Sequence, residues 1–391
     1  MKLTQHLFSN GLVVVSALSF VSATHAQSNI TLYGVVDDGL AYVSNQNGSK
    51  NIYLNAGVYA GNRWGLMGTE NLGGGYSAIF RLEQGFNLNT GVANGSNMAF
   101  QRQAYMGLAN TASGTVTVGR QYPVYWDVIG PYTPLNGLTG ATGAHPGDID
   151  GFDTGIRYNN SVKYMSPKWS ELQGGLMYAL GGQPGSLTNG SAFSAGLHYD
   201  HGPAGFAVAY QQLRNVAGSP SWNAASASSF GISSLNTGYT SAASVQYAAM
   251  LARYTAENWM VGLNYSNVRF KPGSASLFRD TAVFNTYGAI ASYTLSPETL
   301  LMVGYSYTRA SSANGITDAA RYHQIALSQN YNLSKRTTLY LLETYQFGGG
   351  QTLNAAGAIV AATASVGDSQ NATPSSNGRQ FVTMFGIKSA F

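Results

Sequence analysis

The residues best placed to act chemically are charges set into alternating stretches of the chain. Arg63 alternates with the bulky Trp64 and Leu66, and Arg81 shares its side of another such stretch with Glu83. Fixed charges of this kind could act on ions in water beside them, or they could form a structural ion-pair ladder with no other role. The choice between these interpretations depends on the element that carries the charges.

Enzyme signatures are absent from the sequence. The chain has no cysteine and no match to the nucleophile-elbow, zinc-helix or phosphate-loop motifs. Beyond residue 26 the histidines are His145, His198, His201 and His323. His198 and His201 lie around a predicted turn, and His323 with Ser328 is the least unfavourable hydrolase pair. We therefore expect no enzyme and no cofactor or metal site.

The alternation has a period of two, which is the period of a β-strand. The stretches 206–211, 259–266 and 301–308 place bulky apolar side chains on one side and mostly small or polar ones on the other. In a soluble sandwich the apolar side would point into a core. Small and polar residues on the second side instead suit a water-filled interior, because they leave room for water.

The composition favours a membrane protein built from strands. Charged residues make up only 9%, against about 25% in ordinary globular domains, whereas the chain has 48 glycines and 26 tyrosines. Beyond residue 26 no apolar stretch approaches the length of a helical span. A closed barrel pairs every backbone group internally, so we predict an all-β transmembrane barrel. The basic residues are dispersed and the net formal charge is +4, which does not indicate nucleic-acid binding.

Residues 1–26 have the pattern of a secretory signal peptide. Lys2 precedes a short apolar core at 11–21, and a small residue stands before the cleavage site after Ala26. The core is too short for a membrane helix. We predict that this segment is removed and that residues 27–391 form one barrel domain.

Counting the alternating segments gives sixteen strands. They begin near residues 30, 63, 76, 100, 115, 161, 172, 192, 206, 244, 259, 281, 300, 321, 337 and 381. Short turns alternate with long connections, as in an up-and-down antiparallel barrel with both chain ends on the short-turn side. A barrel of about 16–18 strands leaves an aqueous channel. Charges at membrane depth must then face water or protein.

Two stretches have an ambiguous register. In "TTLYLLETYQF" (337–347) either alternating set could face outward, and Gln103 would face outward if Arg102 faces inward. Asp38 is another expected outward polar residue. An outward side that suits neither water nor lipid suggests a protein interface, which we expect on the early strands and the last one.

The chain ends inside a predicted strand, "RQFVTMFGIKSAF", whose last residue is Phe391. We expect this strand to pair with the first one, "ITLYGVVDDGL", because an open sheet edge does not occur in lipid. The terminal aromatic ring would lie at the membrane interface.

Three segments, "NRWGLMGTENLGGGYSAIFRLEQGFN" (62–87), "RQAYMGLANTASGTVTVGRQY" (102–122) and "NNSVKYMSPKWSELQGGLMYALG" (159–181), resemble the trimeric general-diffusion porins of Gram-negative outer membranes, most closely the beta-proteobacterial type. The signal peptide and Phe391 match as well. The resemblance implies a 16-stranded barrel integral to the outer membrane, a homotrimer, and passive diffusion of small hydrophilic solutes and ions. It also implies an inward-folded constriction loop at 123–156 and recognition of the C-terminal strand by the barrel-assembly machinery.

The resemblance further implies a charged constriction. Its basic wall maps to Arg63, Arg81, Arg102, Arg120 and Arg157. The candidate acids are Glu83 and, in the loop, Asp127, Asp148, Asp150 and Asp153. Family members often carry a proline–glutamate pair at the loop tip, where this chain has Asn136. The acids near the loop end could instead bind a cation, but they lack the full spacing of a calcium loop.

We therefore expect a pore that sieves by size. A mild preference for anions should follow, because the arginines of the basic wall carry more charge than the few loop carboxylates that can be placed opposite them, the loop tip having Asn136 in place of a glutamate. Two alternatives stay open. One is a channel of the same fold that is specific for an organic acid, a sugar or a nucleoside, and the other is a structural or adhesive barrel whose pore is incidental.

Overall fold

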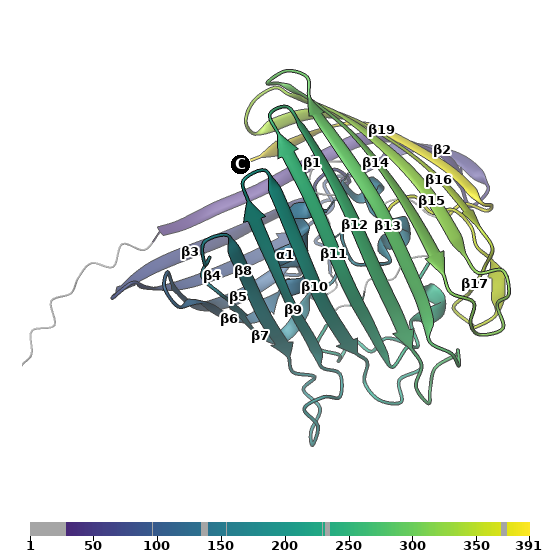
Figure 1. Ribbon diagram of the computed structural model, residues 1–391, viewed down its shortest axis with the longest axis horizontal. Coiled ribbons are helices and arrows are strands. Elements are labelled where there is room, and N and C mark those ends of the chain that lie inside the picture. The colour runs from purple at the N-terminus through teal and green to yellow at the C-terminus, as the bar shows by residue number, and fades with distance from the viewer. Residues whose placement is uncertain are drawn as a thin grey trace, which may run out of the picture.

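The computed structural model describes residues 29–95, 97–133, 140–153, 155–228, 230, 235–368 and 374–391. The predicted signal peptide and Asn136 lie outside these ranges. The described chain forms a closed, 16-stranded antiparallel barrel (Figure 1), as the alternation predicts. No helix among the described residues is long and apolar enough to cross a bilayer.

The barrel strands follow one another in chain order, each paired with its neighbours. The strands are β1 (Asn29–Gln46), β2 (Ser49–Leu54), β3 (Arg63–Gly73), β4 (Tyr76–Gly85), β5 (Gln103–Asn110), β6 (Gly114–Gln121), β7 (Tyr158–Met165), β8 (Leu172–Ala179), β9 (Ala192–His201), β10 (Ala204–Arg214), β11 (Ser244–Ala256), β12 (Trp259–Lys271), β13 (Ala282–Thr294), β14 (Thr299–Ala310), β15 (Arg321–Asn332), β16 (Thr337–Gly349), β17 (Gln351–Leu353), β18 (Ile359–Ala361) and β19 (Arg379–Ala390). β17 and β18 form a separate hairpin in the loop between β16 and β19.

The period-two pattern sorts side chains between the two sides of the wall. On β12, Leu263 faces outward and is 66% exposed, whereas its neighbour Asn264 faces inward and is 8% exposed. Phe385 on β19 is 60% exposed beside the buried Met384. Apolar residues that would be costly in water are therefore placed where lipid covers them.

The cylinder closes between β1 and β19, as expected. Val35 pairs with Ala390 and Val43 with Val382, while the other edge of β19 pairs with β16. Beyond the last ladder pair, Gly34 and Phe391 exchange two backbone hydrogen bonds of 3.1 and 3.0 Å. A Cβ at Gly34 would clash with the Phe391 ring, so the glycine makes room for this closing contact.

The second strand of the barrel is interrupted, which the sequence pattern did not indicate. β2 pairs with the far half of β1, β3 pairs with its near half, and residues 55–62 leave the sheet between them. We call residues 55–62 the inward segment. The buried carboxylate of Asp37 accepts hydrogen bonds from the backbone N–H of Tyr59 (2.8 Å), from the next N–H (2.9 Å) and from the Tyr340 hydroxyl (2.6 Å). Asn62 donates to the Asp37 carbonyl oxygen at 3.0 Å, so this single residue holds the middle and the last residue of the inward segment.

The structure decides the ambiguous registers. Asp38 faces outward, next to the inward-facing Asp37, as expected. The expectation that Gln103 faces outward is wrong: its side chain is buried and lies 3.5 Å from Glu83 inside the barrel. On β16, Tyr340 is buried inside the wall, which turns the Glu343 side chain outward.

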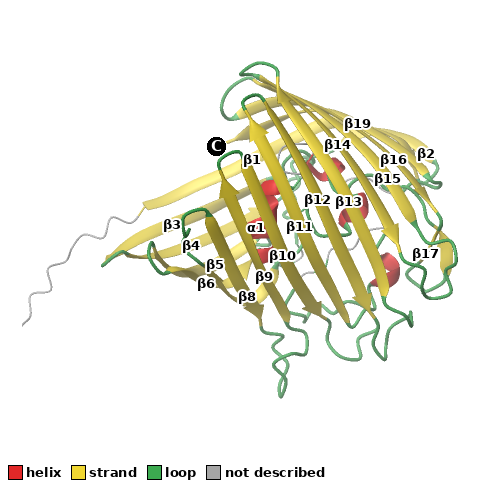
Figure 2. Ribbon diagram, viewed as in Figure 1, coloured by secondary structure: helices red, strands yellow, loops and turns green. Residues whose placement is uncertain are grey.

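A loop of residues 122–157 connects β6 to β7 and folds into the barrel; we call it the inward loop. It holds α1 (Val124–Ile129) and the 3₁₀ turns η1 (Gly130–Tyr132), η2 (Gly140–Gly143) and η3 (Pro146–Asp148), which lie inside the ring of strands (Figure 2). A fourth turn, η4 (Thr237–Tyr239), lies in the loop before β11. Residues of α1 such as Val124, Tyr125 and Ile129 are fully buried against the wall.

A second long loop also enters the barrel. Residues 362–368, between β18 and β19, are mostly buried and contact the inward loop. The N–H of Asp368 donates to the Ala141 carbonyl at 3.0 Å, and the N–H of Gly147 donates to the Gly367 carbonyl at 2.6 Å. Segments from distant parts of the chain thus narrow the channel together.

The closing contact generates a prediction about barrel stability. Phe391→Ser removes the ring that covers Gly34 and should lower the yield of folded barrel several-fold, because closure of the cylinder is what satisfies the edge groups in lipid. Phe391→Tyr, which keeps the ring, is the matched control. The measurement is the fraction of protein with the faster migration of a folded barrel on unheated gels. Equal yields for the serine and tyrosine variants would contradict it.

Candidate pore constriction

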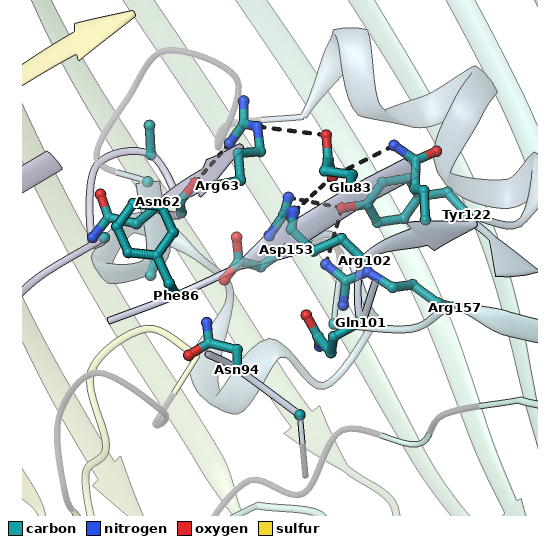
Figure 3. A pocket seen from close by; sticks show the side chains of 18 of the residues that line it. Asn62, Arg63, Glu83, Phe86, Asn94, Gln101, Arg102, Tyr122, Asp153 and Arg157 are labelled. Atoms are coloured by element: carbon teal, nitrogen blue, oxygen red, sulfur yellow. Dashed lines mark hydrogen bonds and ion pairs between the residues drawn. The ribbon is translucent and has the colours of Figure 1, made fainter. Parts of the chain in front are cut away.

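A cavity of about 870 Å³ lies inside the barrel, where the two inward-folded loops approach the wall formed by β3, β4 and β5. Its lining combines these strands with the inward segment, the inward loop and Asp368. The close-up view in Figure 3 shows the charged side chains that meet across it. These contributions leave a narrowed, polar space inside the barrel in place of an open tube.

The basic side of this cavity is built around Glu83. The Arg102 Nε lies 2.7 Å from one carboxylate oxygen of Glu83, and the Arg63 Nε lies 3.9 Å from the other (Figure 3). The Tyr33 hydroxyl also donates to Glu83, at 2.8 Å. Because the carboxylate is nearly buried and fully partnered, it positions two arginines while cancelling only one positive charge.

Tyr122 connects the rest of the basic cluster. Its hydroxyl oxygen accepts hydrogen bonds from Arg102 at 2.8 Å and from Arg157 at 2.9 Å. The Arg157 guanidinium also lies over the Tyr122 ring, 4.8 Å from its centre. Three arginines, from three separate parts of the chain, are thus held together by one carboxylate and one phenol (Figure 3).

The two remaining predicted arginines have different positions. Arg81 lines the cavity, with its guanidinium 5.5 Å from the centre of the Tyr33 ring and 3.5 Å from the Met67 sulfur. Arg120 is not among the residues that line this cavity in the described chain. Its side chain donates to the Gln101 carbonyl and to Asn159, so it joins two segments of the wall behind the constriction.

The predicted loop acids separate into three environments. Asp127 lines the cavity but is paired with Lys163 at 2.7 Å. Asp153 also lines it, while Asp148 accepts the Asp153 N–H at 2.8 Å and is not part of the lining. Asp150 is fully buried behind the loop, where it lies 2.6 Å from His145 and accepts from Ser266 at 2.6 Å. Its carboxylate therefore does not face the cavity.

Burial raises the pKa of Asp148 and of Asp153 well above the ordinary range of an aspartate. Neighbouring negative charge adds to this effect, from Asp150 on Asp148 and from Asp368 on Asp153. Asp153 is also hydrogen-bonded to Asp368. Two carboxyl groups joined in this way titrate as a pair.

The charges that line the cavity do not balance. Its cations are Arg63, Arg81, Arg102, Arg157 and Lys163, and its carboxyl groups are those of Glu83, Asp127, Asp153 and Asp368. Five basic groups therefore face four carboxyl groups. The lining thus carries a net positive charge at neutral pH.

Sequence patterns missed several parts of this site. Tyr122, Lys163 and Asp368 carried no local signal for their roles, since each acts through partners remote in the chain. Tyr122 does follow Arg120 in "VGRQY", inside a segment that resembles the porins, but its contacts to two arginines arise only from folding. The sequence did not predict the inward segment either. Asp37, whose carboxylate binds this segment, lies in an alternating stretch that predicts only a strand.

Comparisons with known proteins agree with this geometry. A family model described as Gram-negative porin matches residues 12–314. An outer membrane porin of Bordetella pertussis is 28% identical over 360 residues, which cover 83% of this chain and 91% of that protein. The solved anion-selective porin from Comamonas acidovorans has a TM-score of 0.72 at 23% identity, over 93% of this chain and all of that one (100%). A trimer form of OmpT from Vibrio cholerae has a TM-score of 0.62 at 16% identity, over 93% and 99% of the two chains.

The family match covers most of the chain, and the solved structures share its barrel architecture. The relative from Bordetella, which is matched over 91% of its length, is named an outer membrane porin. A closed barrel with apolar outer side chains and a charged, open interior agrees with both findings. The chain therefore belongs to the Gram-negative porin family, whose members are channels of the outer membrane and not enzymes.

Proposed function

We propose that this porin passes small hydrophilic solutes with a mild preference for anions. The observation that carries the proposal is the excess of positive charge around the constriction, where five basic groups face four carboxyl groups and the pKa of one of these, Asp153, is raised. A narrow passage with low-dielectric walls focuses the field of such an excess on a permeating ion. The name of the solved Comamonas acidovorans porin, which describes it as anion-selective, supports the same preference.

Roles for the individual residues follow from their contacts. Arg63, Arg81, Arg102 and Arg157 attract anions, while Glu83 and Tyr122 hold three of them in place without neutralising the cluster. Arg120, which lies outside the cavity lining, supports the wall. A channel specific for one organic acid, sugar or nucleoside is the weaker candidate, since the family match is to Gram-negative porins and the solved relative is named for its anion selectivity, not for one solute.

We also propose that the channel works as a homotrimer with contacts through β1, β16 and β19. Asp38 and Glu343 are the outward-facing carboxylates in the middle of the described strands, and both lie in this part of the wall. Charged side chains facing lipid at that depth are costly. Burial against another copy of the chain removes this cost, and the trimer form of the Vibrio cholerae relative is consistent with it.

The selectivity prediction concerns Arg63 and Arg102. The wild type should show a mild anion preference in a salt gradient, weakened as salt rises, because screening shortens to about 10 Å at 0.1 M. Replacing both with glutamate should reverse the preference toward cations. The measurement is the reversal potential across a planar bilayer.

The matched control is Lys335→Glu with Arg336→Glu, which makes the same charge change on a turn outside the constriction. It should move the reversal potential much less. A strongly cation-selective wild type, or equal shifts in both double variants, would show that the constriction arginines do not control permeation.

The pH dependence of selectivity follows from the raised pKa of Asp153. A carboxyl group with a raised pKa stays neutral below that value and gains negative charge as the pH rises through it. The anion preference should therefore fall at a pH well above the ordinary aspartate value of about 3.9, and Asp153→Asn should abolish that change. Reversal potentials from acidic to alkaline pH provide the measurement. A wild-type profile that the asparagine variant reproduces unchanged would refute the assignment.

The trimer prediction uses Asp38→Leu with Glu343→Leu. If these carboxylates lie in an interface, the double variant should shift the population toward monomers in chemical cross-linking and unheated gels. If they faced lipid, leucine would instead stabilise the barrel and leave its assembly unchanged. Val208→Leu, on β10 across the barrel from the proposed contact, is the control that should keep the trimer. A wild type that is purely monomeric and still conducts would also rule out this assembly.

A further inference from the structure

An asparagine followed by a glycine is the dipeptide most prone to lose its side-chain amide. The glycine nitrogen attacks the side-chain carbonyl carbon of the asparagine, and glycine lacks the Cβ that would hinder this approach. Beyond residue 26 the chain has six such pairs, with the asparagine at 47, 94, 136, 189, 314 and 377. Asn136 lies outside the described residues. The structure distinguishes the other five, because the reaction requires an unoccupied side-chain amide and an unoccupied glycine nitrogen.

Hydrogen bonds hold four of the five described pairs. In each of them the glycine nitrogen or the asparagine side chain is occupied, and their asparagines are Asn47, Asn189, Asn314 and Asn377. The Gly48 N–H, for example, donates to the side chain of Asn45 at 2.8 Å. Asn314 is occupied at both amide atoms, since its oxygen accepts from the Asp280 N–H at 2.7 Å and its nitrogen donates to the Asp280 carbonyl at 2.9 Å.

The fifth pair, Asn94 and Gly95, is free at both reacting groups. Within the described part of the chain neither the Asn94 side chain nor the Gly95 N–H makes a hydrogen bond, and Asn94 is exposed. The backbone of Asn94 is nevertheless fixed. Its N–H donates to the Gly85 carbonyl at 2.8 Å, and its own carbonyl accepts from the Gln84 side chain at 2.8 Å. The peptide group is therefore held in place while the side-chain torsions stay free.

The surroundings of this pair also favour the reaction chemically. The peptide nitrogen of Gly95 must lose its proton before it attacks, and the negative charge then spreads to the Asn94 carbonyl oxygen. The Gln84 side chain already donates to this oxygen, as a preorganised donor does for a developing oxyanion. Positive charge acts in the same direction. A Cβ on Gly85 would lie 3.1 Å from the Asn94 Nδ2 and 3.3 Å from the Arg102 Cδ, so the amide lies next to this arginine.

We propose that Asn94 is a site of spontaneous deamidation, which adds a negative charge to the constriction as the channel ages. The Gly95 nitrogen forms a bond to the Asn94 Cγ, the amide nitrogen leaves as ammonia, and water opens the resulting ring to aspartate or isoaspartate. Asn94 lines the cavity (Figure 3), so the new carboxylate joins the four carboxyl groups that face five basic groups there. The anion preference should then fall, a consequence that, unlike the modification itself, rests on the proposed function.

The test keeps the purified, folded channel at mildly alkaline pH and follows every Asn–Gly peptide by mass spectrometry after digestion. Conversion at Asn94 should be roughly tenfold faster than at the four held pairs, which must first break a hydrogen bond. In heat-denatured protein all the pairs should convert at similar rates, because the ranking depends on the fold. Gln84→Met removes the donor to the Asn94 carbonyl and should slow conversion there roughly fivefold. Migration on unheated gels shows that this variant is folded.

Reversal potentials connect the modification with permeation. Asn94→Asp has the side chain of one product and should shift the potential toward cations, and aged wild-type protein should approach it. Asn94→Gln, whose longer side chain disfavours ring closure, is the matched control and should not drift with age. Equal conversion at all the described pairs of the folded channel, or conversion at Asn94 that Gln84→Met does not slow, would overturn the proposed site. Full conversion with an unchanged reversal potential would instead overturn its effect on the pore and would count against the proposed anion preference.

Discussion

Every other feature of this protein depends on the pairing of backbone groups in a medium without water. A strand edge in lipid leaves a row of N–H and C=O groups unsatisfied, and only closure removes it. In this chain the closure joins β1 to β19 over nine ladder pairs and ends in the two hydrogen bonds between Gly34 and Phe391. Once the cylinder is closed, alternation along each strand decides which side chains contact lipid and which contact water.

Closure also creates a water-filled interior that would be wide if nothing entered it. Three segments fill part of this space: residues 55–62, the loop between β6 and β7, and residues 362–368. Their polar backbone groups need partners, and the wall provides them, most clearly through the carboxylate of Asp37. The constriction is therefore a product of hydrogen bonds between the wall and these segments.

The charges around the cavity are held by few partners. Glu83 and Tyr122 position three arginines, and burial together with the neighbouring Asp368 raises the pKa of Asp153 among the opposing carboxyl groups. On the outer side of the barrel, the carboxylates in the middle of the described strands are Asp38 and Glu343, which lie in the proposed subunit contact. The same constraint applies to the inner and the outer side of the wall. A charged side chain is tolerated where water, an ion-pair partner or a subunit interface offsets the cost of its desolvation.

Much of the barrel could be predicted from the sequence, because strand alternation and turn length are local properties. Each of the sixteen predicted strands corresponds to a strand of the structure, and Arg63 and Arg102 both lie beside Glu83 at the cavity. Local patterns could not reveal the break between β2 and β3, the inward side of Gln103, the outward side of Glu343 or the burial of Asp150. Each of these depends on partners tens to hundreds of residues away, as Asp37 depends on Tyr340. The sequence by itself determined a transmembrane barrel with a charged interior, because alternation is local. The tertiary structure alone decided which of the inward charges meet at the cavity, since long-range hydrogen bonds position the inward segments and the arginines beside them.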